Sequence, residues 1–150
     1  MDFNRFTEKL QEAVRAAQSI AVQHGNQQID TEHLMLALLD QEGGLAPSIL
    51  NKADIRVDAL RARFQQEVDR MPKVSGPTGG PDQVYVTNRI TKLLSQAEDE
   101  AKRLKDEYVS VEHVLLAATG YARVFGSCQQ HMFNGDVLVF QALGFVFGLG

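Results

Sequence analysis

The chain has 150 residues, of which 44% are hydrophobic and 23% charged, so it is long and apolar enough to bury a core as one domain or two very small ones. Its net charge of −4 argues against nonspecific binding to nucleic acid or to an anionic membrane, because both need a basic surface. Cys128 is the only cysteine, which excludes an internal disulfide, and the charged start MDFNRFTEKLQ lacks the apolar run of a signal peptide. We therefore expect a cytoplasmic protein that contacts neither nucleic acid nor membrane.

The first predicted helix runs from Phe3 to His24. Its apolar residues recur at spacings of three and four, which places them on one stripe that can face a core. Gly25 and Asn26 end the helix, because both tolerate the left-handed backbone conformation that follows many helices. The stripe comprises Phe6, Leu10, Ala13, Val14, Ala17, Ile20 and Ala21.

Three more helices are predicted before a connector. Asp30 can cap a helix at about Thr31–Leu39, which is apolar nearly all round and should be the buried one. A short helix follows at about Pro47–Lys52, and a fourth, amphipathic one opens at Asp58. Pro72 ends it, and the stretch PKVSGPTGGP is rich enough in proline and glycine to predict a flexible linker.

The pattern then restarts. Residues 87–104 repeat the first amphipathic helix, Ser110 takes the capping place of Asp30, and VEHVLLAAT repeats TEHLMLALL. When the sequence is shifted by 80 residues against itself, the two halves align without a gap over the stretch from Thr7 to Thr119. The matches include polar residues that a chance alignment of two helices would rarely give. The matched pairs are Thr7 with Thr87, Leu10 with Ile90, Ala17 with Ala97, Ala21 with Ala101, Ile29 with Val109, Glu32 with Glu112, His33 with His113, Leu36 with Leu116 and Ala37 with Ala117.

The repeat predicts an all-α bundle of two similar helical units packed as a pseudo-twofold pair, since neither unit alone buries much apolar area. Repeat one spans residues 1–71, the linker 72–86 and repeat two 87–119.

These motifs are familiar. FTEKLQEAVRAAQSIAVQHGNQQIDTEHLMLALLDQEGG and the later VSVEHVLLAA resemble the N-terminal domain of Clp-family AAA+ protein unfoldases. The block HGNQQIDTEHLMLALL and the linker RMPKVSGPTGG resemble the ClpB disaggregase type more than ClpC or ClpA. The resemblance implies an eight-helix pseudo-twofold bundle, tethered to ATPase rings, that receives unfolded or aggregated polypeptides or adaptor proteins and performs no chemistry.

The resemblance also implies which residues bind a partner. Relatives use the matching threonines and glutamates at partner or substrate surfaces, and this carries over to Thr7, Glu32, Thr87, Asp106 and Glu112. In ClpC-type relatives the same threonine and glutamate positions look like a phosphoarginine-binding arrangement, a further option here. A simpler explanation competes, because a glutamate in the first turn of a helix already gains a few tenths to ~1 kcal/mol from the helix dipole.

The histidines and the cysteine give no clear sign of chemistry. Adjacent Glu-His residues point about 100° apart on a helix, whereas a metal needs three or four convergent ligands, so we expect His33 and His113 to pack at the foot of their helices and to hydrogen-bond locally. Cys128 and His131 lack an orienting group or an oxyanion motif. The pattern G-x-x-x-x-G-K-[ST] is absent, so we predict no enzymatic activity, no metal and no cofactor in this chain.

The last segment, residues 120–150, is atypical. Arg123 and Asp136 are its only charges, and it lacks the amphipathic face that the repeat requires of its last two helices. A frameshifted or misjoined reading frame, a genuine divergent ending that still packs as those helices, and a hydrophobic tail that docks on a partner or membrane all fit this composition.

The sequence thus predicts a substrate- or adaptor-binding domain of a ClpB-like ATP-dependent disaggregase, which captures unfolded polypeptide for a tethered AAA+ motor. The alternative is a stand-alone accessory protein that docks on a Clp ATPase and modulates it.

Overall fold

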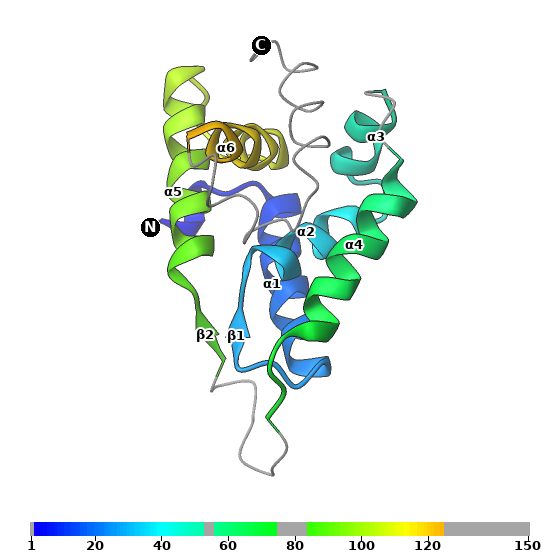
Figure 1. Cartoon of the computed structure of the whole chain (residues 1–150). Helices are drawn as coiled ribbons and strands as arrows, with labels where there is room; N and C mark the ends of the chain where they lie inside the picture. Colours follow the sequence, from blue (N-terminus) through cyan, green and yellow to red (C-terminus); the bar gives the residue numbers. More distant parts are fainter. Residues whose placement is uncertain (1, 53–55, 75–83, 125–150) are drawn as a thin grey trace.

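The computed structural model describes residues 2–52, 56–74 and 84–124. Its α-helices are α1 (Glu8–Gln23), α2 (Thr31–Asp40), α3 (Leu45–Lys52), α4 (Val57–Arg70), α5 (Asn88–Arg103) and α6 (Val111–Val124), with a short 3₁₀ helix, η1 (Phe3–Arg5), before them. Figure 1 shows the helices gathered around α2, with α1 and α4 beside it and α5 and α6 at the other side. The all-α class predicted from the sequence is confirmed.

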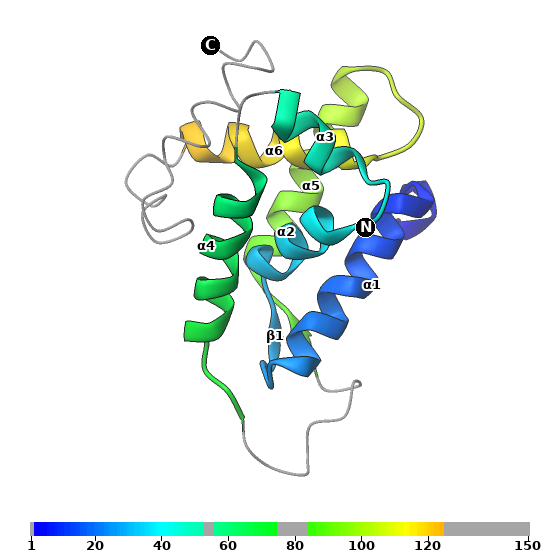
Figure 2. The same cartoon turned by 90° about the vertical axis from the view of Figure 1, so that its right-hand side faces the viewer.

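Helix α2 forms the centre of the core, as its sequence predicted. Nine of its ten residues are buried, and Leu34 and Leu38 have no exposed surface. Figure 2 shows α2 enclosed between α1, α4 and α5, and it contacts each of these helices. Burying a leucine side chain contributes about 1.5–3 kcal/mol, so α2 supplies much of the apolar energy that holds the first repeat together, and it also reaches α5 of the second.

The two repeats use the same signals to begin and end their first helices. The side chains of Thr7 and Thr87 accept the backbone N–H groups of Leu10 and Ile90, and so cap α1 and α5. Each helix then ends at a residue with left-handed backbone, Gly25 (φ +69°) or Lys105 (φ +61°), again 80 positions apart. Lys105 has a β-carbon that disfavours this conformation, so the second ending is held by its backbone hydrogen bonds to the end of α5.

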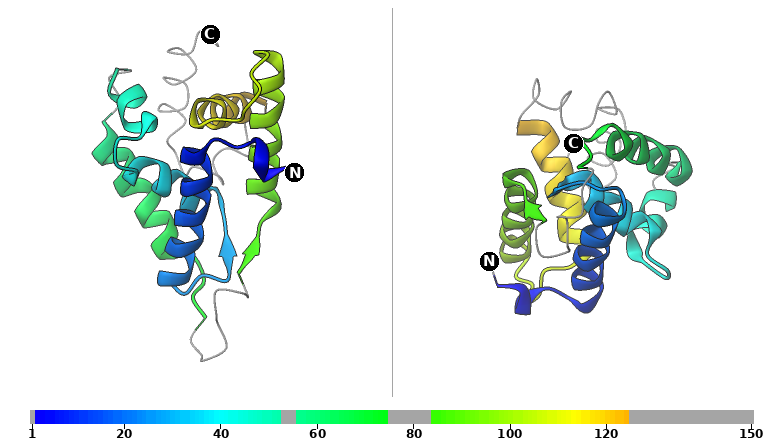
Figure 3. Two further views of the ribbon diagram at one scale, coloured as in Figure 1. Left: turned by 180° about the vertical axis from the view of Figure 1, so that it is seen from behind. Right: turned by 90° about the horizontal axis from the view of Figure 1, so that it is seen from below.

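Short parallel strand pairs join the repeats, which the sequence analysis missed. Strand β1 (Gln28–Ile29) pairs with β2 (Tyr85–Val86), and Phe6 forms the equivalent bridge with Val109. Figure 3 shows β1 and β2 side by side when the molecule is seen from behind. Each repeat therefore pairs the segment before its first helix with the segment before the other repeat's second helix. Period-two alternation cannot reveal strands of two residues.

Other boundaries also differ from expectation. The predicted Phe3–His24 helix is divided, because Phe6 is in extended backbone between η1 and α1. Strand β2 lies inside the predicted 72–86 linker, because Tyr85 and Thr87 donate backbone N–H groups to Gln27 and Ile29 at 2.8 and 3.1 Å.

Helix α6 continues to Val124, past the Thr119 at which we placed the end of repeat two. The expectations for the tail otherwise fall on residues 125–150, outside the described part. Within the described residues no helix is both long and apolar enough to cross a membrane.

Candidate functional site

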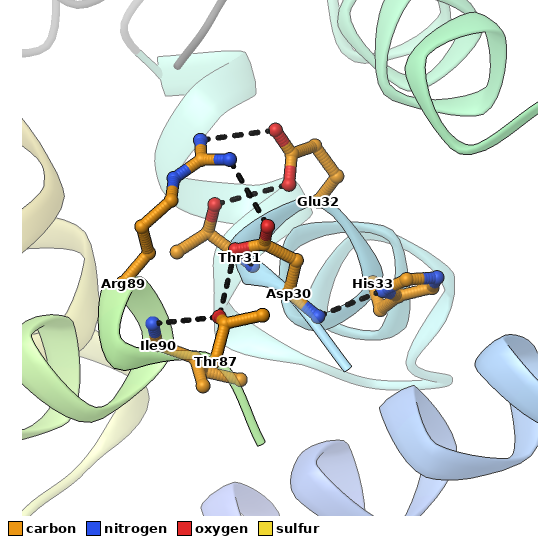
Figure 4. A network of polar contacts seen from close by, with 7 residues as sticks. All are labelled: Asp30, Thr31, Glu32, His33, Thr87, Arg89 and Ile90. Atoms are coloured by element: carbon orange, nitrogen blue, oxygen red, sulfur yellow. Dashed lines mark hydrogen bonds and ion pairs between the residues drawn. The ribbon is translucent and has the colours of Figure 1, made fainter. Parts of the chain in front are cut away.

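A network of charged side chains lies at the start of α2, where the repeats meet (Figure 4). The Arg89 guanidinium, from α5, donates through Nη1 to Asp30 Oδ2 at 3.0 Å and through Nη2 to Glu32 Oε1 at 3.1 Å. The Thr87 hydroxyl donates to Asp30 Oδ1 at 3.0 Å, and the Thr31 hydroxyl donates to Glu32 Oε2 at 3.2 Å. We call Asp30, Glu32, Thr87 and Arg89 the first acidic site.

Burial sets the electrostatics of this site. The Glu32 side chain is only 4% exposed, and its burial raises its pKa above the usual value, although the nearby Arg89 opposes the shift. The Arg89 side chain is 34% exposed, so part of it meets solvent. The site opens on a cavity of about 500 Å³. Its lining includes Asn26, Gln27, Gln28, Asp30, Glu32, Glu67, Arg70, Met71, Pro72, Val74 and Arg89.

A related arrangement lies at the start of α6. The Ser110 hydroxyl, at the position equivalent to Asp30, donates to the Glu112 carboxylate, and Asp106 lies nearby on the same rim. We call Asp106, Ser110, Glu112 and His113 the second acidic site. It lines a shallow hollow of about 470 Å³ together with Leu104, Glu107 and Tyr108. Leu104 is 45% exposed and Tyr108 52%, so this rim combines carboxylates with accessible apolar surface.

Both histidines act as helix caps. His33 Nδ1 accepts the Asp30 backbone N–H at 2.9 Å, and Nε2 contacts Asn26 Oδ1 at 3.1 Å. His113 repeats this with the Ser110 N–H at 2.9 Å and Asp106 Oδ2 at 2.8 Å. Because Nδ1 is an acceptor in each ring, Nε2 carries the proton and donates it. The local hydrogen bonding predicted for these histidines is confirmed.

The second site contains a serine, a histidine and an aspartate in a line, which invites comparison with a hydrolase. Ser110 Oγ lies 3.0 Å from His113 Nδ1, and Asp106 contacts the opposite ring nitrogen. The Nδ1 lone pair is already used by a backbone N–H, however, so it cannot serve as a general base for Oγ. The first repeat builds the same cap with Asp30 and Asn26 and without a nucleophile. The arrangement therefore stabilises the helix start. In the described part of the chain no three or more His, Cys, Asp or Glu side chains are grouped to hold a metal ion.

Four of the five predicted site residues divide between the two sites, and Thr7 lies outside both. Glu32 and Thr87 meet in the first, across the boundary between the repeats, and Asp106 and Glu112 line the second. Thr7 caps α1, and its backbone N–H donates to Val109 at 2.9 Å, close in sequence to Ser110. Among the described residues the five therefore lie at two separate hollows and at the start of α1, and their binding roles stay predictions.

Arg89 is the site residue that sequence reasoning missed. A signal was present, because a cation in the first turn of a helix opposes the helix dipole. Arg89 follows Thr87 by two positions, and Lys9 stands at the same place after Thr7. Such a cation is best explained by nearby carboxylates, which the sequence alone did not locate.

Comparisons with known proteins point to one family. Residues 5–127 match the Clp repeat (R) N-terminal domain family. The chaperone protein ClpB of Nitratidesulfovibrio vulgaris is 46% identical over 114 residues, which cover 76% of this chain and 13% of that protein. ClpB of Bacillus cereus is 44% identical over 117 residues, 78% of this chain and 14% of that protein. This chain thus matches only a small part of the length of these relatives.

Solved structures show the same fold. The Hsp104 N-terminal domain from Candida albicans superposes with a TM-score of 0.69 at 20% identity, over 92% of this chain and 89% of that one. The N-terminal domain of the ClpV1 ATPase from E. coli also has a TM-score of 0.69, at 23% identity, over 79% of this chain and 69% of that one. From the matched residues and the identity to ClpB, the chain belongs to the Clp repeat (R) N-terminal domain family.

Proposed function

We propose that this domain captures unfolded polypeptide or an adaptor protein at the second acidic site, on behalf of a ClpB-like AAA+ motor. The family assignment and the relatives named chaperone protein ClpB support this proposal. A solved structure of similar fold, with a TM-score of 0.65, is named for a peptide from the EAEC T6SS Sci1 SciI protein. The matched segment is the N-terminal domain, and the motor that would use the captured chain belongs to the remainder of the relatives.

The observation that carries the proposal is the open rim of the second site. Within the described residues Glu112 has no ion pair with a lysine or arginine, and its hydrogen-bond partner is the Ser110 hydroxyl. Its carboxylate and that of Asp106 can accept hydrogen bonds from backbone N–H or cationic groups of an extended peptide. Leu104 and Tyr108 offer apolar contact on the same rim.

The shape of this site suits transient capture. The hollow is shallow and open to water, so a bound peptide keeps much of its surface hydrated and buries little apolar area. Ligands held in this way dissociate quickly. A chain that must be handed to a motor benefits from such binding.

The test is binding of a reduced, carboxymethylated model polypeptide, followed by fluorescence anisotropy. We expect Glu112→Gln to weaken binding about tenfold, equivalent to about 1.4 kcal/mol. Asp106→Asn should weaken it less, and it should preserve the histidine cap because Asn26 fills the same role in the first repeat. Asp99→Asn, on an exposed part of α5, is the matched control for loss of one negative charge. Binding by Glu112→Gln at the level of the control, with an unchanged melting temperature, would remove the second site from the proposal.

A further inference from the structure

The two acidic sites differ most in the cation that follows the capping threonine. In the first site this cation, Arg89, lies between two carboxylates. Its counterpart Lys9 forms an ion pair at 3.5 Å with Glu12, on its own helix. The second site also has Ser110 in place of Asp30. One site therefore contains a guanidinium from the chain itself, and the other is open.

The contacts of Arg89 are those expected of a bound ligand. A planar guanidinium donates to carboxylates through two nitrogens at once, which a lysine ammonium cannot match. The Glu32 side chain is only 4% exposed, and a carboxylate at that depth is costly without a cationic partner. The adjoining cavity, about 500 Å³, lies within the range of about 300–1,000 Å³ that is usual for ligand sites.

We propose that Arg89 is a specificity-determining residue, which occupies the first acidic site from within the chain and directs an arginine-bearing partner peptide to the second. The chemical class that both sites accept is a guanidinium group on an extended chain. This inference rests on the proposed function, because it assumes that the second site binds peptide. It makes the first site a latent binding site, closed in the domain as it stands.

The experiment opens one site and closes the other. Arg89→Ala removes the internal guanidinium, and the double variant Lys9→Arg with Ser110→Asp copies the cation and the aspartate of the first site into the second. Aspartate caps helices as well as serine does, so the double variant should fold even if Arg89→Ala does not. Circular dichroism melting checks each variant before binding is measured.

The probe is a fluorescently labelled extended peptide with one arginine among apolar residues, and its matched form carries citrulline, which has the same shape without the charge. Isothermal titration calorimetry gives stoichiometry and affinity. We expect one arginine peptide per wild-type chain and two per Arg89→Ala chain. The double variant should bind at least about tenfold more weakly than wild type, and the citrulline peptide should gain no second site on Arg89→Ala.

The outcomes separate this inference from the proposed function. Suppose that wild type binds the peptide, that Glu112→Gln abolishes this binding, and that folded Arg89→Ala still binds only one peptide per chain. This result overturns the inference and leaves the proposed function standing. An absence of arginine-peptide binding to wild type overturns the inference, because the open second site is then no guanidinium site, whereas the assay with carboxymethylated polypeptide decides the proposed function separately. An unchanged affinity of the folded double variant also counts against the inference, since an internal arginine then fails to close a site of this kind.

Discussion

The N-terminal ends of α2 and α6 share a frame and differ in charge. In both, the histidine three residues after the capping residue accepts a hydrogen bond from that residue's backbone N–H, at 2.9 Å in each case. Around that frame, the start of α2 has a buried glutamate, an aspartate and the Arg89 side chain contributed by α5, whereas the start of α6 has a more exposed glutamate and a serine. The hydrogen bonds that start a helix are therefore separable here from the side chains that decide what the helix start can bind. Matched substitutions in the two repeats test that separation.

The largest effect should come from the cores of the two helices. Leu36 in α2 is 1% exposed, and its counterpart Leu116 in α6 is only half-buried. We expect Leu36→Ala to lower the free energy of unfolding by about 2–5 kcal/mol, because it leaves a cavity in the centre of the bundle. Leu116→Ala should cost less, since water and neighbouring side chains can fill the space.

Urea denaturation monitored by circular dichroism measures both changes. If Leu116→Ala were as costly as Leu36→Ala, α6 would be as central to the core as α2, and the ranking of the two helices would be wrong.

A smaller effect is expected for the cations that follow the two threonines. Arg89→Ala leaves Glu32 buried without its guanidinium, and breaking a buried pair costs about 3–5 kcal/mol. The Arg89 side chain is 34% exposed, so solvent screens part of the ion-pair energy. We therefore expect Arg89→Ala to lower the free energy of unfolding by about 1–3 kcal/mol. Lys9→Ala, the matched control, should stay within about 0.5 kcal/mol because it breaks only an exposed pair.

The same denaturation measurements decide this comparison. Equal changes for the two variants would mean that Arg89 contributes no more to stability than a surface ion pair does.

The sequence predicted the repeated frame well and its polar contacts poorly. The offset of 80 residues, the cap at Asp30 and the buried α2 follow from periodicity and spacing, which are local properties. The pairing of β1 with β2 and the contact of Arg89 with Asp30 join residues 57 to 59 positions apart. Such contacts depend on how the repeats pack, and one sequence records no distance between them. Glu32 and Thr87 were found through family resemblance, whereas Asp30 was recognised only as a cap.

The smallest expected effect is a pH dependence of stability, which differs in sign between the two ionisable residues at the start of α2. Burial raises the pKa of Glu32 and lowers that of His33, so their contributions to stability have opposite signs. Stability linked to Glu32 is fully present below about pH 4.5 and is lost as pH rises through its elevated folded pKa. Stability linked to His33 is present above about pH 6.5 and is lost as pH falls through its depressed folded pKa.

Glu32→Gln isolates the first contribution. The variant cannot ionise, so we expect its unfolding free energy, relative to wild type, to increase as pH rises from 4.5 towards neutrality. The loss of stability that His33 causes at acid pH should remain in both proteins. The difference between the two pH profiles is therefore specific to Glu32. Chemical denaturation at a series of pH values between about 4 and 7 supplies both curves, a range that brackets the usual pKa of each group. If the difference instead fell with rising pH, the ion pair with Arg89 would outweigh the desolvation cost of ionised Glu32. The ionised carboxylate of Glu32 would then stabilise the folded state rather than destabilise it.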